Sequence, residues 1–135
     1  MSDLVAVYGT LRYGGRANGL LKGCRRIGTD VIYATLYDLG SFPGVKLGGS
    51  NLVLVDVYRL PLIGAASVLM SMDRYEGYNP NETDQCLYRR LKVSTVQHQY
   101  HVWVYEYAHA VHEELEIISG DWFHPIRKVD CCETC

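Results

Sequence analysis

Apolar and polar residues alternate along much of this chain in short runs of the kind that predict β-strands. Five runs rich in Val, Leu, Ile and Tyr are separated by clusters of Gly, Pro, Asn and Asp. They cover residues 4–8, 31–37, 51–58, 88–96 and 100–107. Only Gln97, His98 and Gln99 separate the last two runs, so we expect these strands to form an antiparallel hairpin. The pattern predicts a protein that is mostly β.

One segment follows a helical pattern instead. Between residues 63 and 73, apolar side chains recur at spacings that place them on one buried face of a helix. Pro61 just before this segment and Gly77 just after it favour the two ends of such a helix. A second, short helical piece is expected at residues 112–118, after which Trp122 returns to the core.

The size and charge of the chain limit the kinds of protein that it can be. Its 135 residues suffice for one domain that buries its own core. A formal net charge of -2 lacks the basic excess typical of nucleic-acid binding, so we expect no nucleic-acid partner. No apolar run approaches the ~18 residues of a membrane span, and no signal segment precedes the first strand. We therefore expect a cytoplasmic protein with no membrane partner.

The cysteines gather at the C-terminus. Three of the five, Cys131, Cys132 and Cys135, lie in the last five residues, which does not resemble the framework of a secreted disulfide protein. Cys132 and Cys135 form a CxxC pair, but a four-ligand zinc site needs a second pair that the sequence lacks. We expect residues 1–128 to form a single domain, residues 129–135 to be a flexible tail, and no metal site.

The turn after the first strand is the first candidate for a ligand site. Residues 7–12 read Val-Tyr-Gly-Thr-Leu-Arg, where Gly9 tolerates a positive φ and a close approach of a ligand. Backbone N–H groups in such a turn can bind an anion. The following glycines fit neither a P-loop nor a dinucleotide-binding pattern. Alternatively, the segment is an ordinary turn and Arg12 a solvated loop residue, although Arg12 could also steer a substrate carboxylate.

Glu76 is the candidate acid or base. It stands at the end of the predicted helix, where Tyr75 and Tyr78 could desolvate the carboxyl group and move its pKa towards working pH. The alternative is a solvated carboxylate that pairs with Arg74 or Arg89, because most carboxylates are exposed.

In combination, these motifs resemble the gamma-glutamylcyclotransferase-like family, and within it the gamma-glutamylamine cyclotransferase or AIG2-like branch. The resemblance spans roughly residues 4–122 and depends on the order of the motifs along the chain. They are Tyr-Gly-Thr-Leu-Arg at 8–12, Asn18 with Leu20 and Leu21, Phe-Pro-Gly at 42–44, Asp73 with Glu-Gly at 76–77, Tyr-Arg-Arg at 88–90, Tyr105, and Ser-Gly-Asp-Trp at 119–122. The resemblance implies an α+β fold with a small mixed β-barrel flanked by a few helices, in agreement with the predicted strands.

The resemblance also implies a reaction. The substrate would be a small γ-glutamyl amine or γ-glutamyl amino acid, whose α-amine attacks its own γ-carbonyl to close 5-oxoproline and release a free amine. Glu76 would be the general acid/base, and no metal or nucleotide cofactor would be needed. A single chain or a homodimer would be compatible with this chemistry.

The implied substrate-binding residues lie in the turn and on the last two strands. Tyr8, Gly9, Thr10 and Leu11 would cradle the glutamyl end through backbone N–H groups. Tyr88 and Tyr105 either line the pocket or pack in the core.

Two other kinds of function stay open. The same pocket could belong to a non-catalytic binding module that captures a small anionic metabolite or nucleotide, because a fold does not fix a function. The hairpin face that carries Tyr100, Trp103 and Tyr105 could instead contact another protein.

Overall fold

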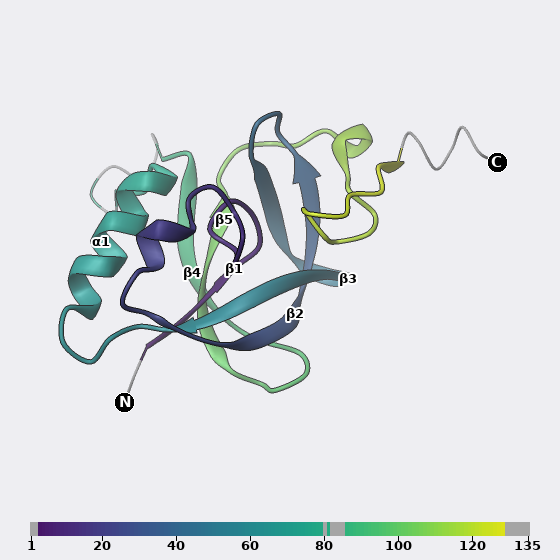
Figure 1. The fold of residues 1–135 in the computed structure, drawn as a ribbon. Coiled ribbons are helices and arrows are strands. Elements are labelled where there is room, and N and C mark those ends of the chain that lie inside the picture. The colour runs from purple at the N-terminus through teal and green to yellow at the C-terminus, as the bar shows by residue number, and fades with distance from the viewer. Residues whose placement is uncertain (1–2, 80, 82–85, 129–135) are drawn as a thin grey trace.

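Five strands form one mixed sheet in the computed structural model, which describes residues 3–79, 81 and 86–128. Their order is β2-β3-β1-β5-β4, so β1 is the central strand (Figure 1). The elements are β1 (Leu4–Val7), the 3-10 helix η1 (Asn18–Leu21), β2 (Arg25–Asp38), β3 (Pro43–Arg59), α1 (Ala65–Glu76), β4 (Tyr88–Ser94), β5 (His101–Tyr107) and the 3-10 helix η3 (Glu113–Leu115).

The central strand pairs in two directions. It runs antiparallel to β3 and parallel to β5, while the β2–β3 and β4–β5 pairs are antiparallel hairpins. The ladder leaves β2 and β4 at its two ends, but the chain just beyond β4 returns to β2, where Val96 N donates to Val31 O at 2.9 Å. The predicted α+β class with a mixed sheet is confirmed, and the sheet curls towards a barrel without a continuous closing ladder.

The long hairpin differs most from its prediction. We expected strands at 31–37 and 51–58, whereas β2 and β3 extend well beyond those limits. Gly48 and Gly49 have φ of 98° and 77°, and the register between β2 and β3 shifts between Tyr33 and Ala34. These glycines therefore form an irregularity within β3 instead of ending the strand.

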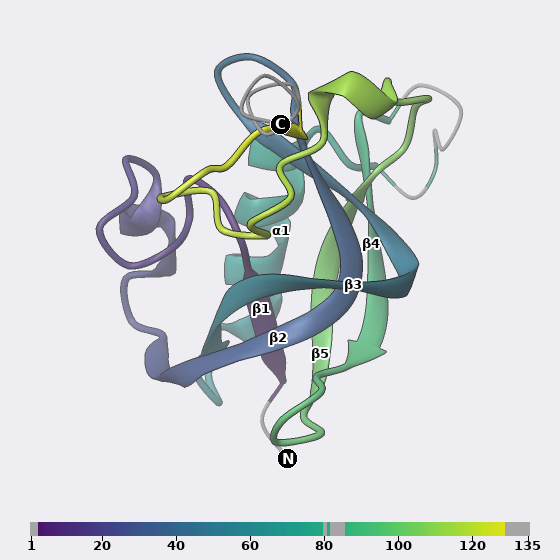
Figure 2. The ribbon, with the colours of Figure 1, turned by 90° about the vertical axis from the view of Figure 1, so that its right-hand side faces the viewer.

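Helix α1 agrees closely with its prediction and covers one face of the sheet, as Figure 2 shows. Gly77 adopts φ 68° directly after the helix, a left-handed conformation that suits glycine at a helix C-terminus. The predicted second helix is reduced to η3, because Glu116 and Ile117 form β-bridges with Tyr37 and Arg127.

Two apolar clusters hold the fold together. One is enclosed by the curled sheet and includes Val45, Val55 and Val104, with Trp122 packed against it as expected. The other lies between β1, β5 and α1 and includes Val7 and Met72. The second cluster fixes α1 against the end of β1, where the candidate site lies.

Two further expectations concern the C-terminal tail and membrane-spanning segments. The tail of residues 129–135, with Cys131, Cys132 and Cys135, lies outside the described residues. Within residues 3–79, 81 and 86–128, no helix has both the length and the apolar character that a membrane crossing requires.

Candidate active site

A cavity of about 240 Å³ lies between the loop after β1 and the last turn of α1, with further walls from β3, β4 and β5. Each candidate site residue from the sequence contributes to its lining: Tyr8, Gly9, Thr10, Leu11, Glu76, Tyr88 and Tyr105. The fold thus brings together segments that are far apart in the sequence. The loop and Glu76 face one cavity because β1 is the central strand and α1 packs against its end.

The loop keeps its shape through a tight turn. Arg12 N donates to Gly9 O at 3.0 Å, and Ala17 N donates to Thr10 O at 2.9 Å. Gly9 does not use the positive φ that glycine tolerates, since it is not among the glycines in that region. Gly9 is needed for a different reason: a Cβ there would lie 2.5 Å from Pro43 Cγ. The close approach that glycine permits is to the protein's own proline.

The same loop presents free backbone donors. Among the described residues, no acceptor is hydrogen-bonded to the N–H groups of Gly9, Thr10 or Leu11. The three are consecutive, and all three residues line the cavity. Successive backbone N–H groups of this kind attract an anion or a developing oxyanion.

Glu76 is the last residue of α1 and is partly buried against the cavity. Burial raises the pKa of its carboxyl group to about 7. Within the described part of the chain, it makes neither a hydrogen bond nor an ion pair. The alternative that Arg89 pairs with Glu76 is wrong, because Arg89 Nη2 lies 3.0 Å from Glu106 Oε1. Arg74 makes no ion pair with Glu76 within the described residues either. Glu76 therefore has a pKa suited to proton transfer near neutral pH.

Three tyrosines surround this carboxylate without donating to it. Tyr8 OH donates to the main-chain O of Tyr105, and Tyr88 OH donates to Pro43 O, both at 2.6 Å. Burial, followed by the nearby charge of Glu76, raises the pKa of Tyr8 and Tyr88 above the ordinary tyrosine value. Burial and the hydrogen bond to Asp73 raise the pKa of Tyr105. Tyr88 and Tyr105 both line the cavity and pack in the core, so the two alternatives for them coexist.

A partly buried ion pair connects α1 to the β4–β5 hairpin. Asp73 Oδ1 accepts from Arg90 Nε at 2.9 Å and from Tyr105 OH at 2.6 Å, and Arg90 Nη2 reaches Asp73 Oδ2 at 3.3 Å. The Arg90 guanidinium also lies over the Trp103 ring, 4.4 Å from its centroid. Since Asp73 precedes Glu76 by less than one helical turn, this network fixes the position of Glu76.

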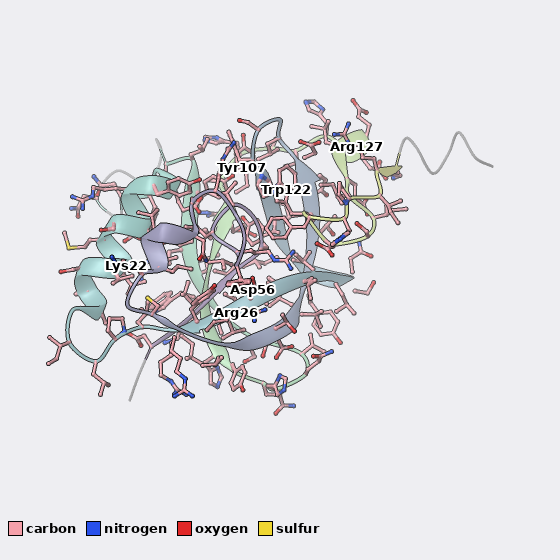
Figure 3. All side chains as sticks on the ribbon, viewed as in Figure 1. Lys22, Arg26, Asp56, Tyr107, Trp122 and Arg127 are labelled. Atoms are coloured by element: carbon pink, nitrogen blue, oxygen red, sulfur yellow. The ribbon has the colours of Figure 1, made fainter. Side chains whose placement is uncertain are left out.

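A second ionic network supports the loop from outside the cavity. Arg12 Nη1 lies 2.9 Å from Asp121 Oδ1, and Arg12 Nε lies 3.6 Å from Asp56 Oδ2. Asp56 also accepts from Tyr13 N at 2.8 Å and lies near Arg26 in Figure 3, with a closest approach of 3.4 Å. Both expectations for Arg12 are therefore wrong: the side chain is buried and does not line the cavity. It holds the loop to β3 and to the C-terminal segment.

Several lining residues were not predicted as site residues. Arg16, Phe42, Pro43, Tyr75 and Leu87 also face the cavity. Tyr75 was noted only for its proximity to Glu76 in sequence, yet its OH lies 2.7 Å from Thr10 Oγ1 and so joins α1 to the loop. The Phe-Pro pair was part of the resemblance, whereas the spacing around Arg16 carries no signal that could have identified it.

The described residues do not offer a metal site, since no three His, Cys, Asp or Glu side chains among them converge on one point. The polar groups that line the cavity include the loop residues with their N–H groups, Glu76 and Arg16.

Comparisons with known proteins agree with this picture. The family described as "Gamma-glutamyl cyclotransferase, AIG2-like" matches residues 5–124. A Vibrio cholerae protein provisionally named gamma-glutamylcyclotransferase is 34% identical over 125 residues, which cover 90% of this chain and 96% of that protein.

Solved structures share the fold. An uncharacterised protein from Pyrococcus horikoshii matches with a TM-score of 0.68 and 27% identity, over 90% of both chains. An AIG2-like protein from Mus musculus matches with a TM-score of 0.64 over 93% of this chain and 85% of that chain, and its 17% identity indicates a common fold alone.

Proposed function

Since the chain belongs to the gamma-glutamyl cyclotransferase, AIG2-like family, we propose that it converts a small γ-glutamyl amine or γ-glutamyl amino acid to 5-oxoproline and a free amine. The observation that carries this proposal is the Glu76 carboxylate, with a pKa of about 7, in a cavity that Gly9, Thr10 and Leu11 also line. Within the described residues, neither this carboxylate nor the backbone N–H groups of the three loop residues have a hydrogen-bond partner. The reaction needs one group that both takes and gives a proton and a second set that stabilises an oxyanion.

Glu76 acts first as a base. It removes a proton from the α-ammonium group of the bound substrate, so that the nitrogen gains a free electron pair. That nitrogen attacks the γ-carbonyl carbon, and the carbonyl electron pair moves onto oxygen. A carboxyl group with a pKa near 7 is well matched to this step, because a substantial fraction is ionised at neutral pH.

Glu76 then acts as an acid. The leaving nitrogen takes the proton that Glu76 holds, the oxyanion returns its electron pair to carbon, and the bond to the leaving nitrogen breaks. The ring nitrogen, which became positively charged in the attack, then gives its second proton to the ionised Glu76, which passes it to the released amine. The products are 5-oxoproline and an amine or amino acid, and no water is consumed. Glu76 ends in the state in which it began, and the chain's own groups supply the whole proton transfer.

The loop binds the glutamyl end. The N–H groups of Gly9, Thr10 and Leu11 are donors for its negative charge and for the oxyanion. The hydrogen-bonded tyrosines and Pro43 form rigid walls that fold the substrate so that amine and carbonyl meet at reacting distance.

Mass spectrometry of γ-glutamyl compounds incubated with the protein tests this function. We expect 5-oxoproline from the wild type and a rate about 10²- to 10⁴-fold lower from Glu76→Gln. Glu114→Gln is the matched control, since Glu114 is exposed in η3 and does not line the cavity. A folded Glu76→Gln that cyclises substrate at the wild-type rate would refute the role of Glu76. No product from any compound, with ligand bound and recovered unchanged, would favour the binding module instead.

A further inference from the structure

Arg16 is the basic side chain among the residues that line the cavity. Its Nη2 donates to Ser41 O at 2.9 Å, which places the guanidinium at the edge formed by residues 41–43. Within the described residues, it makes no ion pair. A guanidinium carries five N–H donors in a planar fork that matches a carboxylate, so most of its donors are available to a ligand.

The exposure of the lining residues shows which end of the cavity is open. Tyr8 and Tyr88 are almost fully buried, whereas Arg16, Tyr75 and Leu87 are exposed. Arg16 therefore lies at the mouth of the cavity.

The cavity, of about 240 Å³, has a buried inner end and an exposed mouth. The glutamyl end must reach Glu76 and the loop N–H groups, so it occupies the part of the cavity next to them. The leaving group then extends towards the mouth, beside Arg16.

The charges of the site favour an anion at that position. Glu76 is the one carboxylate among the lining residues, and the loop N–H groups already provide for the negative charge of the glutamyl end. Within the part of the chain that the structure describes, the guanidinium thus has no anionic partner.

We propose that Arg16 is a specificity-determining residue that binds a carboxylate on the leaving group, so that γ-glutamyl amino acids react in preference to γ-glutamyl amines. This inference rests on the proposed function. Because the carboxylate does not take part in the reaction, its contact with Arg16 is equally strong in the bound substrate and in the transition state. The preference therefore lies mainly in KM.

Two substrates that differ only by the carboxylate test the inference. They are L-γ-glutamyl-L-alanine and L-γ-glutamyl-ethylamine, in which a hydrogen replaces the carboxylate of the leaving group. We expect the wild type to prefer the alanine compound by about five- to thirtyfold in kcat/KM, a modest value because the site is open to solvent.

Variants separate binding from structure. Arg16→Gln should reduce the preference towards one, chiefly by raising KM for the alanine compound, and Arg16→Lys should restore part of it. Arg74→Gln, which removes the same charge from an exposed α1 residue outside the cavity lining, should retain the full preference.

Three results would overturn the inference. The wild type could use both compounds equally, or Arg16→Gln could lower kcat/KM for both by the same factor, as expected if Arg16 binds the glutamyl end or only supports Ser41. In either case 5-oxoproline still forms, so the proposed function stands. If the wild type forms 5-oxoproline from neither these two nor any other γ-glutamyl compound, the proposed function fails and this inference fails with it.

Discussion

Asp73 and Glu76 lie within one turn of each other on α1, yet their surroundings are opposite. Asp73 accepts hydrogen bonds from Arg90 and Tyr105 and is tied to the β4–β5 hairpin. Glu76 has no hydrogen-bond or ion-pair partner within residues 3–79, 81 and 86–128, and burial raises its pKa to about 7. One carboxylate is fixed by its partners, and the other is left free for a ligand.

The contrast indicates how the helix serves the proposed reaction. A buried carboxylate without a partner is unfavourable for folding, and such groups are retained where chemistry needs them. The pair formed by Asp73 and Arg90 secures the helix end, so that Glu76 keeps its position without contacts of its own. Stability and reactivity are thus assigned to neighbouring residues of one helical turn.

Breaking the Asp73 network should give the largest change in the free energy of unfolding. Asp73→Asn removes the charge that faces Arg90, and we expect a loss of about 2–3 kcal/mol in the free energy of unfolding by urea denaturation. Cyclisation should also slow by about ten- to a hundredfold, since Glu76 is no longer held in place. Asp3→Asn is the control, because Asp3 forms only an exposed ion pair with Lys92 and should change stability by less than about 1 kcal/mol. An Asp73→Asn protein as stable as Asp3→Asn would contradict the role assigned to this pair.

Unlike Asp73→Asn, Glu76→Gln should increase the free energy of unfolding. The unfolded carboxyl group ionises near pH 4.5 and the folded one near pH 7, so the folded state binds the proton more tightly and loses stability as pH rises through this interval. Glutamine does not ionise. We expect the variant to be roughly 1–3 kcal/mol more stable than the wild type at pH 8, with little difference at pH 4. Urea denaturation at both pH values measures this, and a variant less stable than the wild type at pH 8 would be inconsistent with an unpaired, desolvated carboxylate.

Tyr105→Phe should have the smallest effect. The ring keeps its place in the cavity wall, while the hydrogen bond from its OH to Asp73 is lost, which corresponds to about 1 kcal/mol of unfolding free energy. Cyclisation should slow by less than about tenfold, because the hydroxyl group donates away from Glu76. The exposed Tyr33, changed to Phe, provides the control for the removal of a hydroxyl group. A loss of rate as large as that of Glu76→Gln would assign Tyr105 to the chemistry itself.

Local sequence patterns predicted the helices and strands that are determined mainly by their own residues. The alternation in β4 and β5 and the helical spacing in α1 gave positions close to those observed. The extent of β2 and β3 could not be predicted in the same way. Gly48 and Gly49 indicate the end of a strand when considered alone, but pairing with β2 carries the strand past them.

The motifs predicted which residues line the cavity, but not which charges are paired. Arg89 and Arg90 are neighbours on β4, so their side chains point to opposite faces. Arg90 reaches Asp73 and Arg89 reaches Glu106, so neither arginine pairs with Glu76. That outcome depends on how the hairpin packs on α1, which is a property of the folded chain. The same is true of Arg16, whose place at the mouth depends on its contact with Ser41.

The most direct test of the central claim compares two titrations. The first follows the Glu76 carboxyl carbon by ¹³C NMR, with Glu76→Gln used to identify its resonance, and the second measures kcat/KM for a γ-glutamyl substrate against pH. Because the ionised carboxylate is the base, kcat/KM should rise with pH, and both titrations should have their midpoint at about pH 7. A Glu76 that titrates near pH 4.5, or a kcat/KM that does not change around pH 7, would contradict the proposed role of Glu76 in proton transfer.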